Sequence, residues 1–341
     1  MNVFQKSTYY LSLVFSTLMV YFVFAENPMH LGSIIGYVLA GYILMHLSVK
    51  FKEHKKTMIL MIFLAGLPLV LVKVLAVFKI SGLGFLGISY MTFKLIQIII
   101  EIYDGLIEKP MGPLDYVHFL LFFPALSSGP IDRSRRFLED WKKQRTKDEY
   151  LELAGTGLFR LVLGLFYKLV ISGMVFQQMT SIRYKDFSFF VIYMYLYTAY
   201  LFFDFAGYSL MAVGASNILG IETPMNFNVP FISVDIKDFW NRWHITLSTW
   251  LRDFVFSRIV MRFMRKKIFK KRLTTAMVAY MINMTFMGFW HGITLNYIAY
   301  GFYHGILMAA FEWYQKKSKF YKKNKNKTWY KVISWIITMH L

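Results

Sequence analysis

The sequence of 341 residues contains no cysteine. This absence excludes disulfides, thiolate metal sites and a cysteine nucleophile. Charged residues are also scarce, at 17% of the chain, whereas a soluble domain usually carries about 25%. The shortage is mainly acidic, because 19 Asp and Glu stand against 39 Lys and Arg and give a formal net charge of +20. With 57% hydrophobic residues, the composition predicts a membrane protein.

Several catalytic motifs are missing as well. The sequence has no P-loop, no G-x-G-x-x-G, no H-E-x-x-H, and no G-x-S-x-G in a triad context. These absences argue against nucleotide hydrolysis, metalloproteolysis and a serine hydrolase, and we predict no metal site. The first 25 residues lack a basic start and an A-x-A cleavage site, so we expect the apolar segment 8–25 to remain in the mature protein.

Long uncharged runs are the main positive feature of the chain. A membrane-spanning helix needs about 20 mostly apolar residues. The runs without Asp, Glu, Lys or Arg are 8–25, 27–49, 187–203, 205–221, 273–290 and 292–311. They predict an all-α, polytopic membrane protein.

Basic residues gather in four segments between these runs: 50–56, 132–149, 258–272 and 316–327. Cytoplasmic loops of membrane proteins are enriched in Lys and Arg, so we expect all four on the cytoplasmic side of the cell membrane. The same rule explains the net charge without nucleic acid as a partner.

The expected topology follows from this placement. Segments 57–80 and 83–101 form one hairpin, and segments 273–290 and 292–315 form another, whose tip points to the outer half of the membrane. Segment 116–131 contains Pro124 and Gly129-Pro130, and we expect it to be re-entrant or interfacial, because irregular backbone persists at that depth only when protein or water covers it.

One membrane domain, residues 1–341, accounts for all of these segments. The final stretch, 328–341, begins another apolar segment and stops before it could span a bilayer. We therefore expect the chain to be truncated at its end, and its start also to lie inside a longer protein.

His291 is the leading candidate for a catalytic residue. It stands in Trp290-His291-Gly292, at the junction of two membrane-length apolar runs. An ionisable side chain in that position is costly unless it is paired or lines a polar cavity, so it indicates function. The alternative is a structural histidine bonded to a backbone carbonyl.

A second polar cluster lies at 237–254, KDFWNRWHITLSTWLRDF. Helical spacing places Asn241, His244 and Ser248 on one face, opposite an aromatic face. We therefore expect one amphipathic helix, either with His244 near the site or as a plain interfacial helix.

Asp204 interrupts two apolar runs, and the Ala206-Gly207 that follows it favours a helix break. We expect Asp204 to orient a His or a Lys, or to bond a hydroxyl, in support of a polar site. His304 is flanked by Gly301 and Gly305, a spacing typical of close helix packing, so we assign it to packing or to support of the site.

Two stretches identify a family resemblance: FWNRWHITLSTWLRDFVF at 239–256 and MGFWHGITLNYIAYGFYHG at 287–305. They resemble the membrane-bound O-acyltransferases, and within that family the branch that esterifies teichoic acid with D-alanine. Supporting stretches lie at 83–106, 120–137 and 200–231. The resemblance implies a fold of about ten membrane-spanning or re-entrant helices around a central tunnel.

The resemblance also implies a reaction. D-alanine is carried as a phosphopantetheine thioester on a small cytoplasmic carrier protein, and the enzyme moves it to lipoteichoic acid outside, with no cofactor bound by the enzyme itself. The family's active histidine corresponds to His291 and its second motif histidine to His244. A neutral imidazole can accept the proton of the attacking hydroxyl, an effect worth roughly 10²–10⁴ in rate. Asn241, Asp204 and Trp290 are the expected supporting residues.

The basic segment 258–272 holds eight basic residues and no acid. Carriers of this class are acidic, so we expect the segment to steer and dock the carrier. Its docking residues would be Arg258, Val260, Met261, Arg265, Lys266 and Lys267. Orientation in the membrane is the alternative explanation for these charges.

Two other functions stay open at this point. A family member that acetylates an exopolysaccharide such as alginate would share the histidine motifs, and a transporter or flippase could use His291 in its substrate path. It also stays open whether a second membrane-anchored protein on the outer side completes the transfer.

Overall fold

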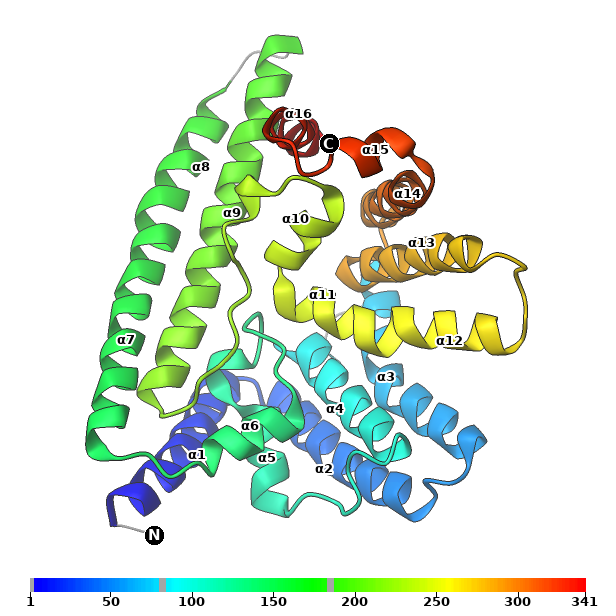
Figure 1. Ribbon diagram of the computed structural model, residues 1–341. Helices are drawn as coiled ribbons and strands as arrows, with labels where there is room; N and C mark the ends of the chain where they lie inside the picture. Colours follow the sequence, from blue (N-terminus) through cyan, green and yellow to red (C-terminus); the bar gives the residue numbers. More distant parts are fainter. Residues whose placement is uncertain (1–2, 80–83, 183–186) are drawn as a thin grey trace. The chain divides into compact units, whose positions relative to one another are not determined.

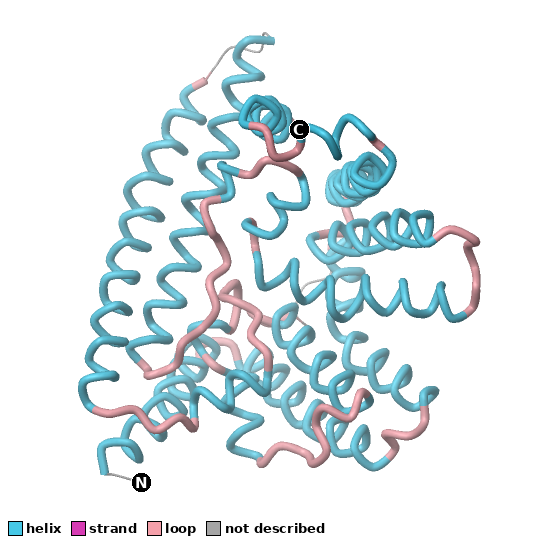
Figure 2. The backbone as a smooth tube through the Cα atoms, in the orientation of Figure 1, coloured by secondary structure: helices cyan, strands magenta, loops and turns pink. Residues whose placement is uncertain are grey.

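The computed structural model describes residues 3–79, 84–182 and 187–341. All regular structure in these ranges is helical, as Figures 1 and 2 show, which confirms the all-α prediction. Within the described residues, four helical stretches are long and apolar enough to cross a membrane: Pro28–Lys50, Lys55–Val77, Lys147–Ser181 and Phe187–Ile218. The chain divides into two compact units, and the expectation of a single domain stays a prediction.

Unit 1 comprises Met1–Leu69 and Gly82–Met225. Its helices are α1 (Val3–Phe24), α2 (Pro28–Lys50), most of α3 (Lys55–Val77), α4 (Ile88–Tyr103), α5 (Pro113–Leu121), η1 (Phe123–Ala125), α6 (Ser134–Trp141), α7 (Lys147–Leu165), the π-helical η2 (Phe166–Ile171), α8 (Ser172–Ser181) and α9 (Phe187–Ile218).

The core of unit 1 surrounds α4, which is buried over most of its length. Lys94 on this helix is only 2% exposed, and its Nζ donates to the carbonyl of Phe119 at 2.9 Å. The ammonium thereby satisfies a carbonyl at the C-terminal end of α5, where a helix has no partners of its own. Segment 116–131 is thus a short helix followed by irregular backbone that protein covers, whereas its expected re-entrant or interfacial position stays a prediction.

Helices α7, η2 and α8 form one continuous stretch that packs along α9 (Figure 1). Glycines allow the two backbones to approach closely: a Cβ on Gly157 would lie 2.7 Å from the carbonyl oxygen of Gly214, and one on Gly164 would lie 2.6 Å from that of Gly207. Such small residues are the usual means of close packing between membrane helices.

Asp204 lies within this hairpin and forms an ion pair with Lys168 of the π-helical turn. The predicted break after Asp204 is wrong, because α9 continues unbroken from Phe187 to Ile218. The lysine supplies the counter-charge that the carboxylate needs, so the helix does not have to open there. Of the partners that the sequence suggested for Asp204, a lysine is the one found.

Unit 2 comprises Val70–Ser81 and Asn226–Leu341. Besides the end of α3, it contains η3 (Pro230–Ile232), α10 (Ile236–Arg242), α11 (Ile245–Leu251), the π-helical η4 (Arg252–Phe256), α12 (Ser257–Arg265), α13 (Arg272–His291), α14 (Leu295–Lys317), α15 (Lys319–Asn324) and α16 (Thr328–His340). The two packed helices expected at 273–290 and 292–315 are found as α13 and α14, whereas the outward direction of their tip stays a prediction.

Glycines again set the distance between α13 and α14. A Cβ on Gly288 would lie 2.4 Å from the carbonyl oxygen of Tyr297 and 2.9 Å from the Cα of Gly301. Gly305 faces Met281 in the same way, since a Cβ added to it would lie 3.1 Å from the Met281 Cα. The packing role expected for the glycines around His304 is therefore confirmed.

Candidate active site

The two histidine motifs of the sequence both fold within unit 2. The predicted continuous helix over 237–254 is wrong, because the chain leaves helical geometry at Trp243 and His244, between α10 and α11. His244 has φ +43° and ψ 53°, in the left-handed region, and only 3% of its surface is exposed. That conformation is uncommon for residues other than glycine, and such positions gather at functional sites.

Backbone hydrogen bonds from the preceding loop hold this break open. The amide of Asn228 donates to the carbonyl of Arg242 at 3.0 Å, and the amide of Ile245 donates to the carbonyl of Asn226 at 2.9 Å. The Thr246 hydroxyl also donates to the Asn226 side chain at 2.6 Å. The loop therefore binds the chain on both sides of His244 and fixes where its imidazole points.

His291 is the last residue of α13, and its side chain is exposed. The ring of Tyr297 stacks beside the imidazole at a centroid distance of 6.0 Å and an angle of 16°, and Tyr300 lies edge-on at 6.0 Å. The ammonium of Lys73 reaches within 3.5 Å of the His291 carbonyl oxygen. An accessible imidazole between two phenols is able to meet a substrate from the loop side of the hairpin.

Trp290 connects the two motif histidines. Its ring lies 4.7 Å from the His291 ring and 6.4 Å from the His244 ring, measured between centroids. The chain thus brings together His244, Trp290 and His291, three of the residues expected at the site, whereas their roles stay predictions. Asn241 is exposed at the end of α10, whereas Asp204 belongs to unit 1 with its partner Lys168.

A third histidine, His304, packs beside the site, in line with the packing or supporting role expected for it. His304 packs its ring against Trp240 at 5.2 Å and against Tyr300 at 4.6 Å, and Tyr300 also touches His291. Its Nδ1 is buried and makes no hydrogen bond among the described residues. The sequence shows only a spacing of thirteen residues between His291 and His304, whereas packing shows that they share one aromatic cluster.

A cavity of about 180 Å³ lies between α10, α11, α13 and α14. Met284, Met287 and Met308 form much of its apolar wall, and Asn241 and Ser248 add polar groups. Two further wall atoms, Trp240 Nε1 and Asn283 Oδ1, are buried and make no hydrogen bond within the described ranges. A flexible apolar chain that carries a polar group would fit these walls, since methionines adapt to irregular ligands.

The basic segment at 258–272 folds as α12 and a turn that leads to α13. Arg265, Lys266 and Lys267 are exposed together with Met261, whereas Arg258 and Val260 are half-buried. Met264 and Ile268 add exposed apolar surface between the cations. The expected docking residues therefore form a mixed cationic and apolar surface, although Arg258 and Val260 contribute less of it than the sequence suggested.

The sequence is similar to those of named acyltransferases. The chain is 44% identical over 262 residues to the teichoic acid D-alanyltransferase of Bacillus subtilis (strain 168), a match that covers 76% of this chain and 66% of that protein. It is 37% identical to the enzyme of the same name from Lacticaseibacillus rhamnosus, covering 90% of this chain and 80% of that protein.

A probable alginate O-acetylase of Pseudomonas fluorescens is 33% identical, over 66% of this chain and 44% of that protein. The match to the Bacillus relative spans about two thirds of the length of that protein. The sequence profile of the membrane-bound O-acyltransferase family matches residues 35–341, which include both histidine motifs. The chain belongs to the membrane-bound O-acyltransferase family.

Proposed function

We propose that this protein transfers D-alanine from the phosphopantetheine thioester of a cytoplasmic carrier protein to teichoic acid. The identity of 37–44% to three teichoic acid D-alanyltransferases supports this acceptor and this acyl group. The observation that carries the proposal is the contact of both motif histidines, His244 and His291, with the single indole of Trp290.

His291 acts as the general base in this proposal. An alcohol is a poor nucleophile at neutral pH, whereas a thioester is already activated for attack. The imidazole accepts the proton as the hydroxyl oxygen bonds to the D-alanyl carbonyl carbon; the carbon–sulfur bond breaks, and the proton passes to the departing thiolate. Exposure of His291 at the α13–α14 turn supports this role, because the acceptor has to reach the base.

His244 and Asn241 orient the thioester. His244 is buried and its backbone is held on both sides, so its imidazole is a fixed group rather than a mobile one. Asn241 and Ser248 line the cavity of unit 2, where a pantetheine arm can lie along the methionines, although neither His244 nor His291 is among its lining residues. Fixed groups of this kind accelerate a reaction because no reorganisation is needed in the transition state.

The carrier docks on α12 and the turn after it. Arg265, Lys266 and Lys267 steer the acidic carrier, and Met261 supplies an apolar contact at the centre. This requires the basic segments to face the cytoplasm, with lipoteichoic acid approaching from the outer side, directly or through a second membrane-anchored protein.

The test is reconstitution of the chain with its D-alanyl-loaded carrier in vesicles that contain lipoteichoic acid. We expect D-alanyl ester to form, and His291→Ala to abolish it while membrane insertion and thermal stability stay close to wild type. His46→Ala is a matched control, since His46 is another histidine on an apolar helix and bonds only the carbonyl of Tyr42 in its own helix. Equal ester formation by His291→Ala would refute the assignment of the base.

The similarity to alginate O-acetylases, at 31–33% identity, supports a second candidate acceptor. The same vesicles supplied with an acetyl donor and alginate separate the two functions. Acetyl transfer to the polysaccharide without D-alanyl transfer would favour this alternative.

A further inference from the structure

A second cavity, of about 560 Å³, lies in unit 1 and is separate from the histidine site. Its walls come from the α6–α7 connection, from the first turns of α7, and from the segment that follows α9. In contrast to the methionine-lined cavity of unit 2, it is lined mainly by charged and polar side chains. The proposed acyl transfer makes no use of it.

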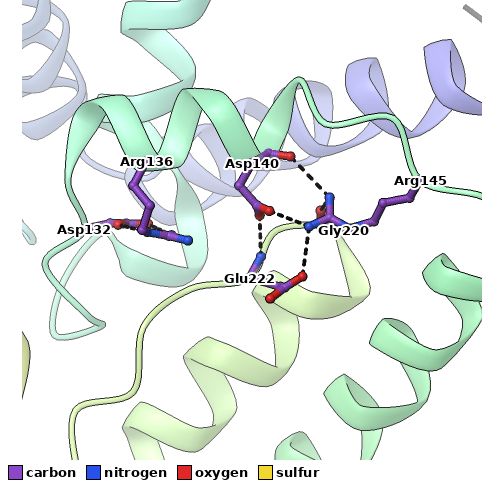
Figure 3. A network of polar contacts seen from close by, with 6 residues as sticks. All are labelled: Asp132, Arg136, Asp140, Arg145, Gly220 and Glu222. Carbon is purple, nitrogen blue, oxygen red and sulfur yellow. Dashed lines mark hydrogen bonds and ion pairs between the residues drawn. The ribbon is translucent and has the colours of Figure 1, made fainter.

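A network of ion pairs fixes the rim of this cavity (Figure 3). Arg145 donates to the carboxylate of Asp140, to the carbonyl of Gly220 at 2.8 Å, and to Glu222 at 3.2 Å. The amide of Glu222 in turn donates to Asp140 at 2.7 Å. These bonds tie the segment after α9 to the end of α6, so the cavity is formed before any ligand arrives.

Two cations in the walls form no ion pair with a carboxylate in the described part of the chain, although Lys143 lies in the electrostatic field of Glu149. Lys143 makes no ion pair there, and Arg160 bonds only a neutral amide: the Asn217 oxygen, in the orientation that satisfies both ends of the amide, accepts from Arg160 Nη1 at 2.6 Å. Three carboxylates also line the cavity. Glu149 bonds Thr146 in the capping box and Glu222 pairs with Arg145, whereas Glu152 forms no ion pair among the described residues.

Thr223 supplies the second, independent indication of a ligand. Its side chain lines the cavity, it is only 7% exposed, and its hydroxyl is buried without a hydrogen-bond partner among the residues that the structure describes. A buried hydroxyl that makes no bond costs free energy, so native proteins rarely retain one without a ligand or water to meet it. The hydroxyl and the two cations are all donors, which is the set that a phosphate group requires.

The length and charge pattern of the stretch that contains α7 indicate that this cavity lies near lipid headgroups. The apolar stretch Lys147–Ser181 has 35 residues and is about 50 Å long, longer than a hydrocarbon core of about 30 Å. Its first turns carry Lys147, Asp148, Glu149 and Glu152, which are costly in hydrocarbon, so we place this end of the stretch at the interface. Arg160 lies further along the helix, and its long side chain can reach that level. Basic pockets between membrane helices at this depth typically bind phosphorylated headgroups.

We propose that this cavity binds the phosphate group of an anionic phospholipid, held by Arg160, Lys143 and the hydroxyl of Thr223. The occupied site would clamp the start of α7 to the end of α9. The proposal does not depend on the reaction at His291.

The experiment measures thermal stabilisation and lipid affinity of the detergent-purified full chain. The probes are phosphatidylglycerol, diacylglycerol with the same acyl chains, and inorganic phosphate. We expect phosphatidylglycerol to stabilise the protein and diacylglycerol to have no effect. If inorganic phosphate binds as tightly as the lipid, the phosphate site is supported and its occupant is a soluble phosphate.

Three variants locate the binding. Thr223→Val keeps the side-chain shape and removes a hydroxyl that makes no bond in the described structure, so it should fold as wild type and bind phosphatidylglycerol on the order of tenfold more weakly. Lys143→Gln should also weaken binding, and the matched control Lys147→Gln, an exposed lysine outside the cavity, should not. Equal stabilisation by diacylglycerol, or wild-type affinity in both Thr223→Val and Lys143→Gln, would overturn the proposal.

Discussion

The rings of His244 and Trp290 lie 6.4 Å apart between centroids, at an angle of 53°. Residues 46 positions apart in the chain meet because α10 and α13 both pack against α14. The Trp290 ring also lies 4.7 Å from the His291 ring, measured between centroids. One indole therefore lies between a buried histidine and an exposed one, which is the arrangement that the proposed roles of a fixed orienting group and an accessible base require.

The left-handed backbone of His244 leads to the first prediction. Asparagine tolerates this conformation, so His244→Asn should keep the free energy of unfolding near wild type while activity falls. A β-branched residue does not, so His244→Val should lose activity and also about 1–3 kcal/mol of stability. Denaturation in detergent, measured beside D-alanyl transfer, separates the two effects. Equal stability of both variants would contradict strain at this position.

Close packing of α13 on α14 leads to the second prediction. A Cβ on Gly288 would meet the carbonyl oxygen of Tyr297 at 2.4 Å, so Gly288→Ala has to push the helices apart and move His291. We expect a lower melting temperature and a fall in turnover. Gly155→Ala is the control, because nothing lies within 4 Å of its Cβ and alanine favours the helix by about 0.5–1 kcal/mol. Parallel behaviour of the two variants would count against the close contact.

The sequence predicted the parts of the fold that depend on local pattern. Uncharged runs located the α13–α14 hairpin, and the ionisable side chain at its tip identified His291. The break at His244 was not predictable in this way, because it is imposed by hydrogen bonds from Asn226 and Asn228, well before it in the chain. Helical periodicity alone favoured a continuous helix there.

Tertiary partners were equally hidden from the sequence. Asp204 pairs with Lys168, 36 residues earlier, and only the packing of α9 on the π-helical turn brings them together. The cluster of Trp240, Tyr300 and His304 likewise arises from contacts between helices that the spacing of residues does not encode. Long-range contacts of this kind require the folded chain.

The pair of Lys168 and Asp204 leads to the third prediction. Asp204→Asn leaves an ammonium without its counter-charge in an apolar helix hairpin, so it should cost roughly 2–4 kcal/mol of stability. The double variant Lys168→Met with Asp204→Leu removes both charges and should recover most of that loss. A double-mutant cycle by thermal denaturation gives the coupling. Additive losses in the cycle would show that the pair contributes nothing to the hairpin.

The cationic surface of α12 leads to the last prediction. Replacing Arg265, Lys266 and Lys267 together with glutamate should raise the KM for the carrier strongly at low salt and less at high salt, because exposed charges act through a screened field. Turnover at saturating carrier should change little, since these side chains are exposed at the end of α12 and in the turn after it. The matched control is Lys322, Lys323 and Lys327 to glutamate, an equal change of charge in the basic segment at 316–327. If both triple variants raise KM equally, the net charge of the protein rather than α12 attracts the carrier. If only the α12 variant raises KM, the basic segment at 258–272 has a docking role beyond orientation in the membrane.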